Sequence, residues 1–168
     1  SKSGTRYALG PTPVAPTLVY EQSQVVSSGD KILYLHNGGL LDRLPQEGID
    51  TSGTTVSASS DWDLSPALSQ DLVFSAGTID VSLSMETSGS AVIRAELYDG
   101  ATLIGASASQ NLNLAAPEVR LFQIILAADY TVPSGNAPTL RVVNTGNKSA
   151  TIYAFNVGAS MVSFATTT

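Results

Sequence analysis

The stretch LVFSAGTIDVSLSMETSGSAVIRAELYDGATLIGASA, residues 72–108, holds three apolar runs separated by Ser-Gly and Asp-Gly. Within residues 79–86 and again within residues 93–98, apolar and polar side chains alternate. A period of two predicts β-strands with one buried face and one solvated face, as in an antiparallel sheet. The apolar positions are Ile79, Val81, Leu83, Met85, Ile93, Ala95 and Leu97.

Similar short runs recur along the chain, and they predict an all-β protein. Turn residues separate them at intervals of about 8–12 residues, which is typical of sandwiches and barrels. The runs are 17–26, 31–36, 110–114, 118–126, 139–144, 150–157 and 160–164. In residues 118–126 we expect Phe122, Ile124 and Leu126 to share the buried face. The prediction is an antiparallel, jelly-roll-like β-sandwich of about nine or ten strands, in which irregular residues 40–71 add one strand near 54–58.

The first sixteen residues differ from the rest of the chain. They contain three prolines and two glycines without apolar periodicity, which predicts an extended arm. We therefore expect an arm over residues 1–16 and a single sandwich domain over residues 17–168. We further expect the arm to contact a neighbouring subunit. The side chains expected to do so are Tyr7, Leu9, Pro11, Pro13, Val14 and Pro16.

Composition excludes several classes of function. Of the 168 residues, 43% are hydrophobic and only 13% are charged, and the net charge is −6. Eight scattered Lys and Arg residues form no basic stripe, so we expect no nucleic-acid partner. No apolar run approaches the ~20 residues of a membrane-spanning helix, so we expect no membrane insertion. The absence of cysteine excludes disulfides and thiolate-bound metals.

Residues able to carry out catalysis are few. His36 is the only histidine, and it ends an apolar run beside Asn37-Gly38-Gly39. A histidine at a strand end is more simply bonded to backbone than used in a Ser-His-Asp triad, and no Gly-x-Ser-x-Gly motif accompanies it. Carboxylates such as Glu86 and Glu96 lie on the polar side of alternating strands, where solvation explains them. We therefore predict a protein that is not an enzyme, with no catalytic residue and no cofactor.

Two weaker binding hypotheses remain. Asp61, Asp63 and Asp71 could supply oxygen ligands to a structural calcium ion, although turn and capping roles explain them more simply. Trp62, Tyr98 and Tyr130 could form an aromatic platform that stacks on sugar rings, although Trp62 could instead fill the core. Polysaccharide is thus an alternative partner.

The order of several pieces between Asp61 and Phe164 resembles jelly-roll modules. These pieces are Trp62, Asp71-Leu72, the strand end Glu-Leu-Tyr-Asp-Gly at 96–100, Thr102, Val-Pro-Ser-Gly at 132–135, and Leu140-Arg141-Val142. Such modules occur in phage capsid decoration and fibre proteins and in secreted carbohydrate-binding modules. The resemblance implies a β-sandwich and is architectural.

These observations lead to a structural function. Low charge, abundant Ser, Thr and Ala, and the proline-rich arm predict a subunit that packs against itself or against a capsid or filament lattice. We expect a phage capsid decoration protein, located in a virion. The alternatives are an extracellular filament or surface-layer subunit at the cell surface, and a secreted carbohydrate-binding module.

Overall fold

The computed structural model describes residues 30–166, and this part of the chain is all-β. It contains no helix, and so none that is long and apolar enough to cross a membrane. The first seven strands are β1 (Asp30–His36), β2 (Leu40–Asp42), β3 (Thr54–Val56), β4 (Ser59–Leu64), β5 (Leu72–Phe74), β6 (Gly77–Thr87) and β7 (Ala91–Asp99). The next seven are β8 (Thr102–Ala106), β9 (Gln110–Leu112), β10 (Glu118–Leu126), β11 (Tyr130–Val132), β12 (Pro138–Asn144), β13 (Ala150–Tyr153) and β14 (Met161–Ala165).

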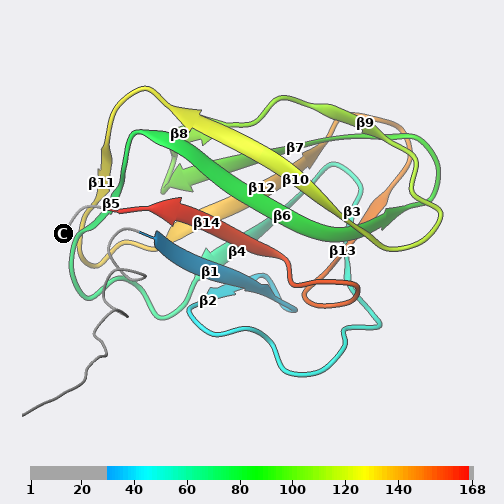
Figure 1. The fold of residues 1–168 in the computed structure, drawn as a ribbon, viewed down its shortest axis with the longest axis horizontal. Helices are drawn as coiled ribbons and strands as arrows, with labels where there is room; N and C mark the ends of the chain where they lie inside the picture. Colours follow the sequence, from blue (N-terminus) through cyan, green and yellow to red (C-terminus); the bar gives the residue numbers. More distant parts are fainter. Residues whose placement is uncertain (1–29, 167–168) are drawn as a thin grey trace, which may run out of the picture. The chain divides into compact units, whose positions relative to one another are not determined.

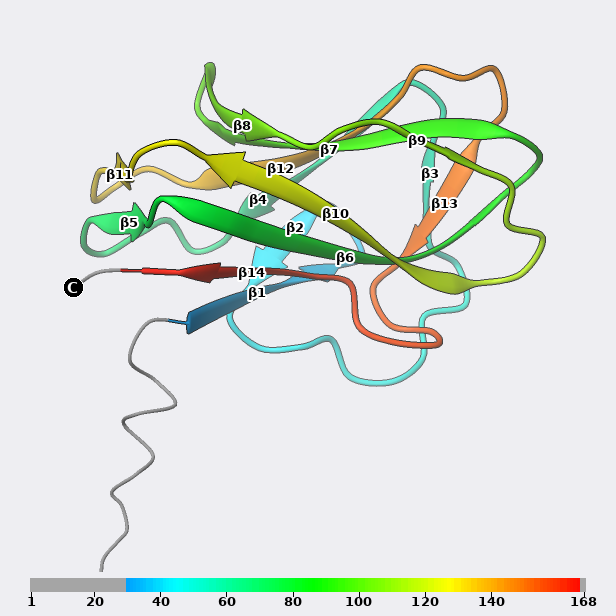
Figure 2. The same cartoon turned by 45° about the horizontal axis from the view of Figure 1, so that its top comes forward.

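Twelve of these strands form one sheet that folds into two layers (Figures 1 and 2). Its order is β3-β13-β6-β14-β1-β2-β4-β12-β7-β8, with β10 added on β6 and β9 on β7. One layer holds β10, β6, β14 and β1, and the other holds β4, β12, β7 and β8. Strand β2 joins the layers because it pairs with β1 on one side and with β4 on the other. Strands β5 and β11 form a separate two-stranded ribbon.

The two ends of this folded sheet approach each other. Ser107, just after β8, forms an isolated bridge with Ile124 of β10. Strand β10 also pairs with β6 along nine residues, from Glu118 opposite Met85 to Leu126 opposite Gly77. The two layers therefore come together at this edge through a single bridge.

The prediction of an all-β fold is confirmed, but the prediction of a purely antiparallel sheet is wrong. Strand β2 pairs with β4 in parallel, with Leu40 opposite Asp63 and Leu41 opposite Leu64. The described residues also form more strands than expected, because several are only three residues long and too short to show alternation. The expected excursion over residues 40–71 contains three strands, and Trp62 lies within one of them.

The alternation predicted for the central stretch is confirmed. Its seven apolar positions have no exposed surface, and Phe122, Ile124 and Leu126 on β10 are likewise buried. However, β6 and β7 follow each other in sequence without pairing: β6 pairs with β10, β13 and β14, whereas β7 pairs with β12, β8 and β9. Alternation identified the buried face of each strand but not its neighbours.

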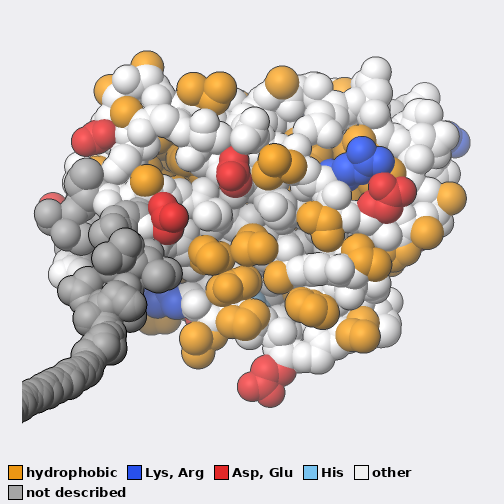
Figure 3. Space-filling model, in the orientation of Figure 1, with side chains coloured by type: hydrophobic (Ala, Val, Ile, Leu, Met, Phe, Trp, Pro, Cys, Tyr) orange, Lys and Arg blue, Asp and Glu red, His pale blue; other side chains and the backbone are white. Residues whose placement is uncertain are grey.

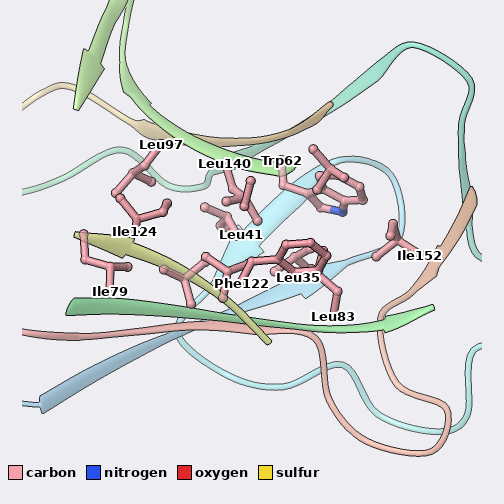
Figure 4. Packing of buried hydrophobic residues seen from close by; sticks show 14 of the residues in the cluster. Leu35, Leu41, Trp62, Ile79, Leu83, Leu97, Phe122, Ile124, Leu140 and Ile152 are labelled. Carbon is pink, nitrogen blue, oxygen red and sulfur yellow. The ribbon is translucent and has the colours of Figure 1, made fainter. Parts of the chain in front are cut away.

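Side chains from both layers meet in the core (Figure 4). Trp62 and Leu140 come from one layer and Phe122 and Leu83 from the other, and each is at most 1% exposed. Each buried Leu, Ile or Phe contributes roughly 1.5–3 kcal/mol to folding. A chain without cysteine is thus stabilised by this packing. The predicted arm over residues 1–16, with its six named side chains, and the run at 17–26 lie outside the described residues.

Candidate functional site

The outward face of β4, β12 and β7 carries two rows of polar side chains. Strand alternation turns Trp62, Leu140 and Leu97 inward and their neighbours outward. In the first row Arg141 lies opposite Asp61 on one side and Glu96 on the other. In the second row Thr139 lies between Asp63 and Tyr98. A central cation thus stands between two carboxylates.

The side chains of these rows are bonded to one another. Arg141 donates from Nε to Asp61 Oδ1 at 2.7 Å and from Nη2 to Oδ2 at 2.9 Å. Its guanidinium carbon lies 4.7 Å from the centre of the Tyr98 ring. Glu96 accepts from Tyr98 Oη at 2.9 Å and from Arg94 Nε at 2.8 Å. Both oxygens of Glu96 are therefore occupied.

These contacts shift the pKa values of Asp61 and Tyr98. The hydrogen bonds from Arg141 hold the pKa of Asp61 below its ordinary value. The hydrogen bond to the Glu96 carboxylate raises the pKa of Tyr98 above its ordinary value. At neutral pH Asp61 is ionised and Tyr98 is neutral. Since the carboxylates are engaged by their neighbours, this face is suited to fixed contacts rather than to proton transfer.

A pocket of about 410 Å³ opens beside β1, β2 and β14. Leu33, Leu64, Leu68 and Phe164 form its apolar floor, and each is at most 9% exposed. Exposed polar side chains surround its opening: Lys31, Arg43, Ser69, Gln70 and Asp71. Apolar lining with a few polar groups is the usual composition of a small-molecule site.

The cations at this pocket differ from the other cations of the described chain. Salt bridges pair Arg94 with Glu96, Arg120 with Glu118, and Arg141 with Asp61. Within residues 30–166 this leaves three cations without an ion pair, namely Lys31, Arg43 and Lys148. Two of these three line the pocket.

His36 forms a hydrogen bond with a backbone carbonyl. Its Nε2 atom lies 2.7 Å from the carbonyl oxygen of Leu44, to which it donates. In a Ser-His-Asp triad this nitrogen would instead accept the serine proton. His36 therefore serves the turn that follows β1 in this conformation.

The three aromatic residues predicted as a platform do not share a surface. Trp62 is 1% exposed and points into the core, so its ring cannot stack on a sugar. Tyr98 lies on the outward face of β7, where it contacts Arg141. Tyr130 belongs to β11 and donates to Asp99 Oδ2 at 3.1 Å.

The three aspartates considered for calcium do not converge either. Asp61 and Asp63 share the outward face of β4, but Arg141 binds the first and the Thr139 hydroxyl donates to the second. Asp71 accepts from the Ser134 backbone N–H at 2.9 Å. Among residues 30–166, no group of three or more His, Cys, Asp or Glu side chains is placed to hold a metal ion.

Sequence reasoning missed the role of Asp50, which is 3% exposed. Its Oδ1 accepts from the backbone of Ser52 and Gly53 at 3.0 and 2.9 Å, and its Oδ2 accepts from Ala154 N–H at 2.9 Å. Asp50 thereby fastens the loop before β3 to the loop after β13. The local signal was Asp followed three residues later by Gly, an Asx-turn pattern, but the contact with Ala154 has no local signal.

Sequence reasoning also missed an exposed apolar face. Val119, Leu121 and Ile125 on β10 are 44%, 47% and 73% exposed, and Phe155 and Val157 follow β13. A side chain at Gly158 would meet Val119, so that loop lies against β10. Figure 3 shows hydrophobic side chains spread over the face that carries β10, β6, β14 and β1. We call the five residues Val119, Leu121, Ile125, Phe155 and Val157 the outer apolar face.

The fold is similar to part of several larger solved structures, which are hydrolases. No family model and no curated protein sequence matches the chain. An aminopeptidase from a marine sediment archaeon, Thaumarchaeota archaeon, has a TM-score of 0.66 at 9% identity, over 83% of this chain and 37% of that chain. A CocE/NonD family hydrolase from Staphylococcus aureus has a TM-score of 0.62 at 8% identity, over 84% and 37%. An α-amino acid ester hydrolase has a TM-score of 0.60 at 15% identity, over 81% and 36%.

These identities show a shared fold alone, and this chain spans little more than a third of each neighbour's length. The neighbours nevertheless correct the function predicted from sequence. They are hydrolases, not capsid decoration, fibre or carbohydrate-binding modules. The predictions of a virion subunit, of its filament and sugar-binding alternatives, and of a protein that is not an enzyme are therefore wrong. The phrases behind the resemblance, such as Glu-Leu-Tyr-Asp-Gly, are strand and turn patterns shared by many sheet proteins.

Proposed function

We propose that the chain is the β-sheet part of an enzyme that hydrolyses esters or amides. The observation that carries this proposal is the fold, which accounts for 36–37% of several hydrolase chains. One of those proteins is an amino acid ester hydrolase and another is an aminopeptidase, so both ester and peptide bonds are represented.

In this proposal the bond-breaking groups lie outside residues 30–166. His36 is committed to the Leu44 carbonyl, and Asp61 and Glu96 are engaged by arginines. A hydrolytic triad needs a histidine free to take a proton from the nucleophile. The described part of the chain would therefore support and shape a catalytic site supplied by another domain or chain.

The outer apolar face supports a contact with such a domain. Ile125 is 73% exposed and Leu121 is 47% exposed, and both lie on the same side of β10. Exposed apolar side chains gathered on one face are typical of protein–protein contact surfaces. The occupant that we propose is the catalytic domain of the hydrolase, because the neighbouring hydrolase chains extend well beyond this fold.

The test is whether hydrolytic activity accompanies the chain in its native source. An extract would be separated by size exclusion, and its fractions assayed with p-nitrophenyl acetate and alanine p-nitroanilide. We expect activity to co-elute with the chain above its own mass of 17.4 kDa. Depletion with an antibody against the chain should remove that activity, and antibody saturated with purified chain should not.

Two results would contradict the proposal. Activity that is unchanged after complete depletion would separate the chain from hydrolysis. Hydrolysis by the purified chain alone would place the reacting groups within its 168 residues. It would contradict the proposal that another domain or chain supplies the catalytic site.

We also propose that the two layers form a jelly-roll sandwich. The placement of β6 and β7, and of β12 and β13, in opposite layers supports this finer classification. A crystal structure with a different order of strands would contradict it.

A further inference from the structure

We propose that the pocket beside β1, β2 and β14 binds a small organic acid, with its carboxylate at Lys31 and Arg43 and its apolar body on the floor. The inference rests on the pocket's own residues and does not depend on the proposed function. We call this pocket the acid pocket.

The first argument is the supply of charge. Lys31 and Arg43 are two of the three described cations without an ion pair, although the whole chain has a net charge of −6. Among residues 30–166 no carboxylate forms a salt bridge with either cation. Both are therefore free to pair with an anionic ligand, and arginine offers the planar fork that matches a carboxylate.

The second argument is the amount of charge. Asp71 also lies at the opening, so the lining carries two positive charges and one negative charge. The Asp71 carboxylate accepts from the Ser134 N–H at Oδ1 and is partly turned to that loop. A net charge of +1 balances one carboxylate, whereas a phosphate monoester carries about −1.5 to −2 at pH 7. The balance favours a carboxylate.

The third argument is the apolar floor. Leu33, Leu64, Leu68 and Phe164 are nearly buried, so an aliphatic or aromatic body placed on them would leave water without disturbing polar groups. The volume of about 410 Å³ lies within the range of roughly 300–1,000 Å³ found for small-molecule sites. The ligand is thus an acid with an apolar body rather than acetate alone.

The fourth argument is that the loop at the opening is held in place. Leu68 N–H donates to Asn136 O at 2.9 Å, and Gly135 N–H donates to Leu68 O at 2.8 Å. These backbone bonds and the Asp71–Ser134 bond fix the segment that presents Ser69 and Gln70. A site that is already ordered loses less entropy when it binds.

The test is calorimetric titration of the full chain with 3-phenylpropionate. We expect saturable binding with one site per chain. Three further ligands test which features of the acid are recognised. 3-Phenylpropanol lacks the carboxylate charge, acetate lacks the apolar body, and phenethyl phosphate carries a larger negative charge. Each should bind at least about tenfold more weakly than 3-phenylpropionate, which corresponds to about 1.4 kcal/mol.

Variants locate the site. Arg43→Gln and Lys31→Gln should each weaken binding of 3-phenylpropionate about tenfold, because each removes one charge-assisted contact. Lys148→Gln is the matched control, since Lys148 is also exposed and unpaired but lies away from the pocket. It should leave the affinity unchanged, and circular dichroism should show that all three variants are folded.

Several outcomes would overturn the proposal. These are no saturable binding up to about 10 mM ligand, equal affinity for 3-phenylpropanol, and tighter binding of phenethyl phosphate. An equal loss of affinity in Lys148→Gln would show that the acid binds by overall charge rather than in the acid pocket.

Discussion

At the scale of single residues, Asp50 shows how one buried carboxylate joins two loops that are far apart in sequence. Burial raises the pKa of Asp50, but hydrogen bonds from the Asn37 side chain and from the backbone of Gly53, Ala154 and Ser52 outweigh that effect. The pKa of Asp50 therefore lies below its ordinary value. The charged form is the one that the fold stabilises.

Asp50→Asn should lower the free energy of unfolding by about 3 kcal/mol at pH 7, because an amide leaves one of the backbone donors unsatisfied. Since the folded-state pKa is lowered, the contribution of Asp50 is fully present above about pH 4 and is lost as the pH falls through the lowered pKa. Urea unfolding between pH 7 and pH 2.5 measures both effects. Glu47→Gln, an exposed change in the same loop, is the control, and an equal loss there would contradict this role.

Tyr153 provides a second test at this scale. The hydrogen bond that its hydroxyl donates to Glu86 Oε1 at 2.7 Å, together with burial, raises the pKa of Tyr153 to about 12. Its contribution to stability is present below about pH 10 and is lost as the pH rises toward 12. Absorbance of the tyrosinate ion, compared between the wild type and Tyr153→Phe, should show one tyrosine titrating near 12. Glu86→Gln should lower that midpoint, and a wild-type midpoint near 10 would contradict the assignment.

At the scale of strands, sequence patterns were informative only where a strand was long. The alternation in β6 and β7 identified their buried faces correctly, because it runs over residues 79–86 and 93–98. Strand β2 has three residues, and its parallel pairing with β4 depends on a turn and on contacts that alternation does not encode. For the same reason, Trp62 could not be assigned to the core before its strand was known.

Gly39 is central to that pairing. It ends the turn between β1 and β2 with φ +77°, and its carbonyl accepts from Asp63 N–H at 2.9 Å. A Cβ at Gly39 would lie 2.9 Å from the backbone oxygen of Asp61, whereas a Cβ at Gly38, with φ +88°, would meet nothing within 4 Å. Gly38 is thus a matched control with the same backbone strain and no clash.

Gly38→Ala should lower the free energy of unfolding by about 1 kcal/mol, the usual cost of a left-handed conformation for alanine. Gly39→Ala should cost about 1–3 kcal/mol more, because β4 must move away from the turn. Urea unfolding curves of the two variants measure the difference. Equal losses would show that the contact between the turn and β4 is unimportant.

At the scale of the whole molecule, the sequence indicated the fold class but not the arrangement of charges. The paired rows on β4, β12 and β7 depend on register, because Arg141 meets Asp61 across 80 positions of sequence. Lys31 and Arg43 reach one pocket only because β1 and β2 are neighbours. No local pattern marks either site, and so the candidate platform and calcium residues were chosen from residue type alone.

The boundary of the cooperatively folding part of the chain can also be tested. Contacts within the chain divide it between Asp30 and Lys31, and the core of the described part runs from Leu33 to Phe164. A chain that begins at residue 30 keeps every one of these core residues. We therefore expect it to unfold cooperatively in urea, with a free energy of unfolding within about 0.5 kcal/mol of the full chain, since it keeps the whole described core. A loss of more than about 2 kcal/mol, or a broad transition, would show that residues 1–29 contribute to the same core.

The matched comparison is removal of residues 162–168, which deletes Val162 and Phe164 from β14. This deletion should abolish cooperative unfolding, because two buried core side chains and the pairing of β14 with β6 are lost together.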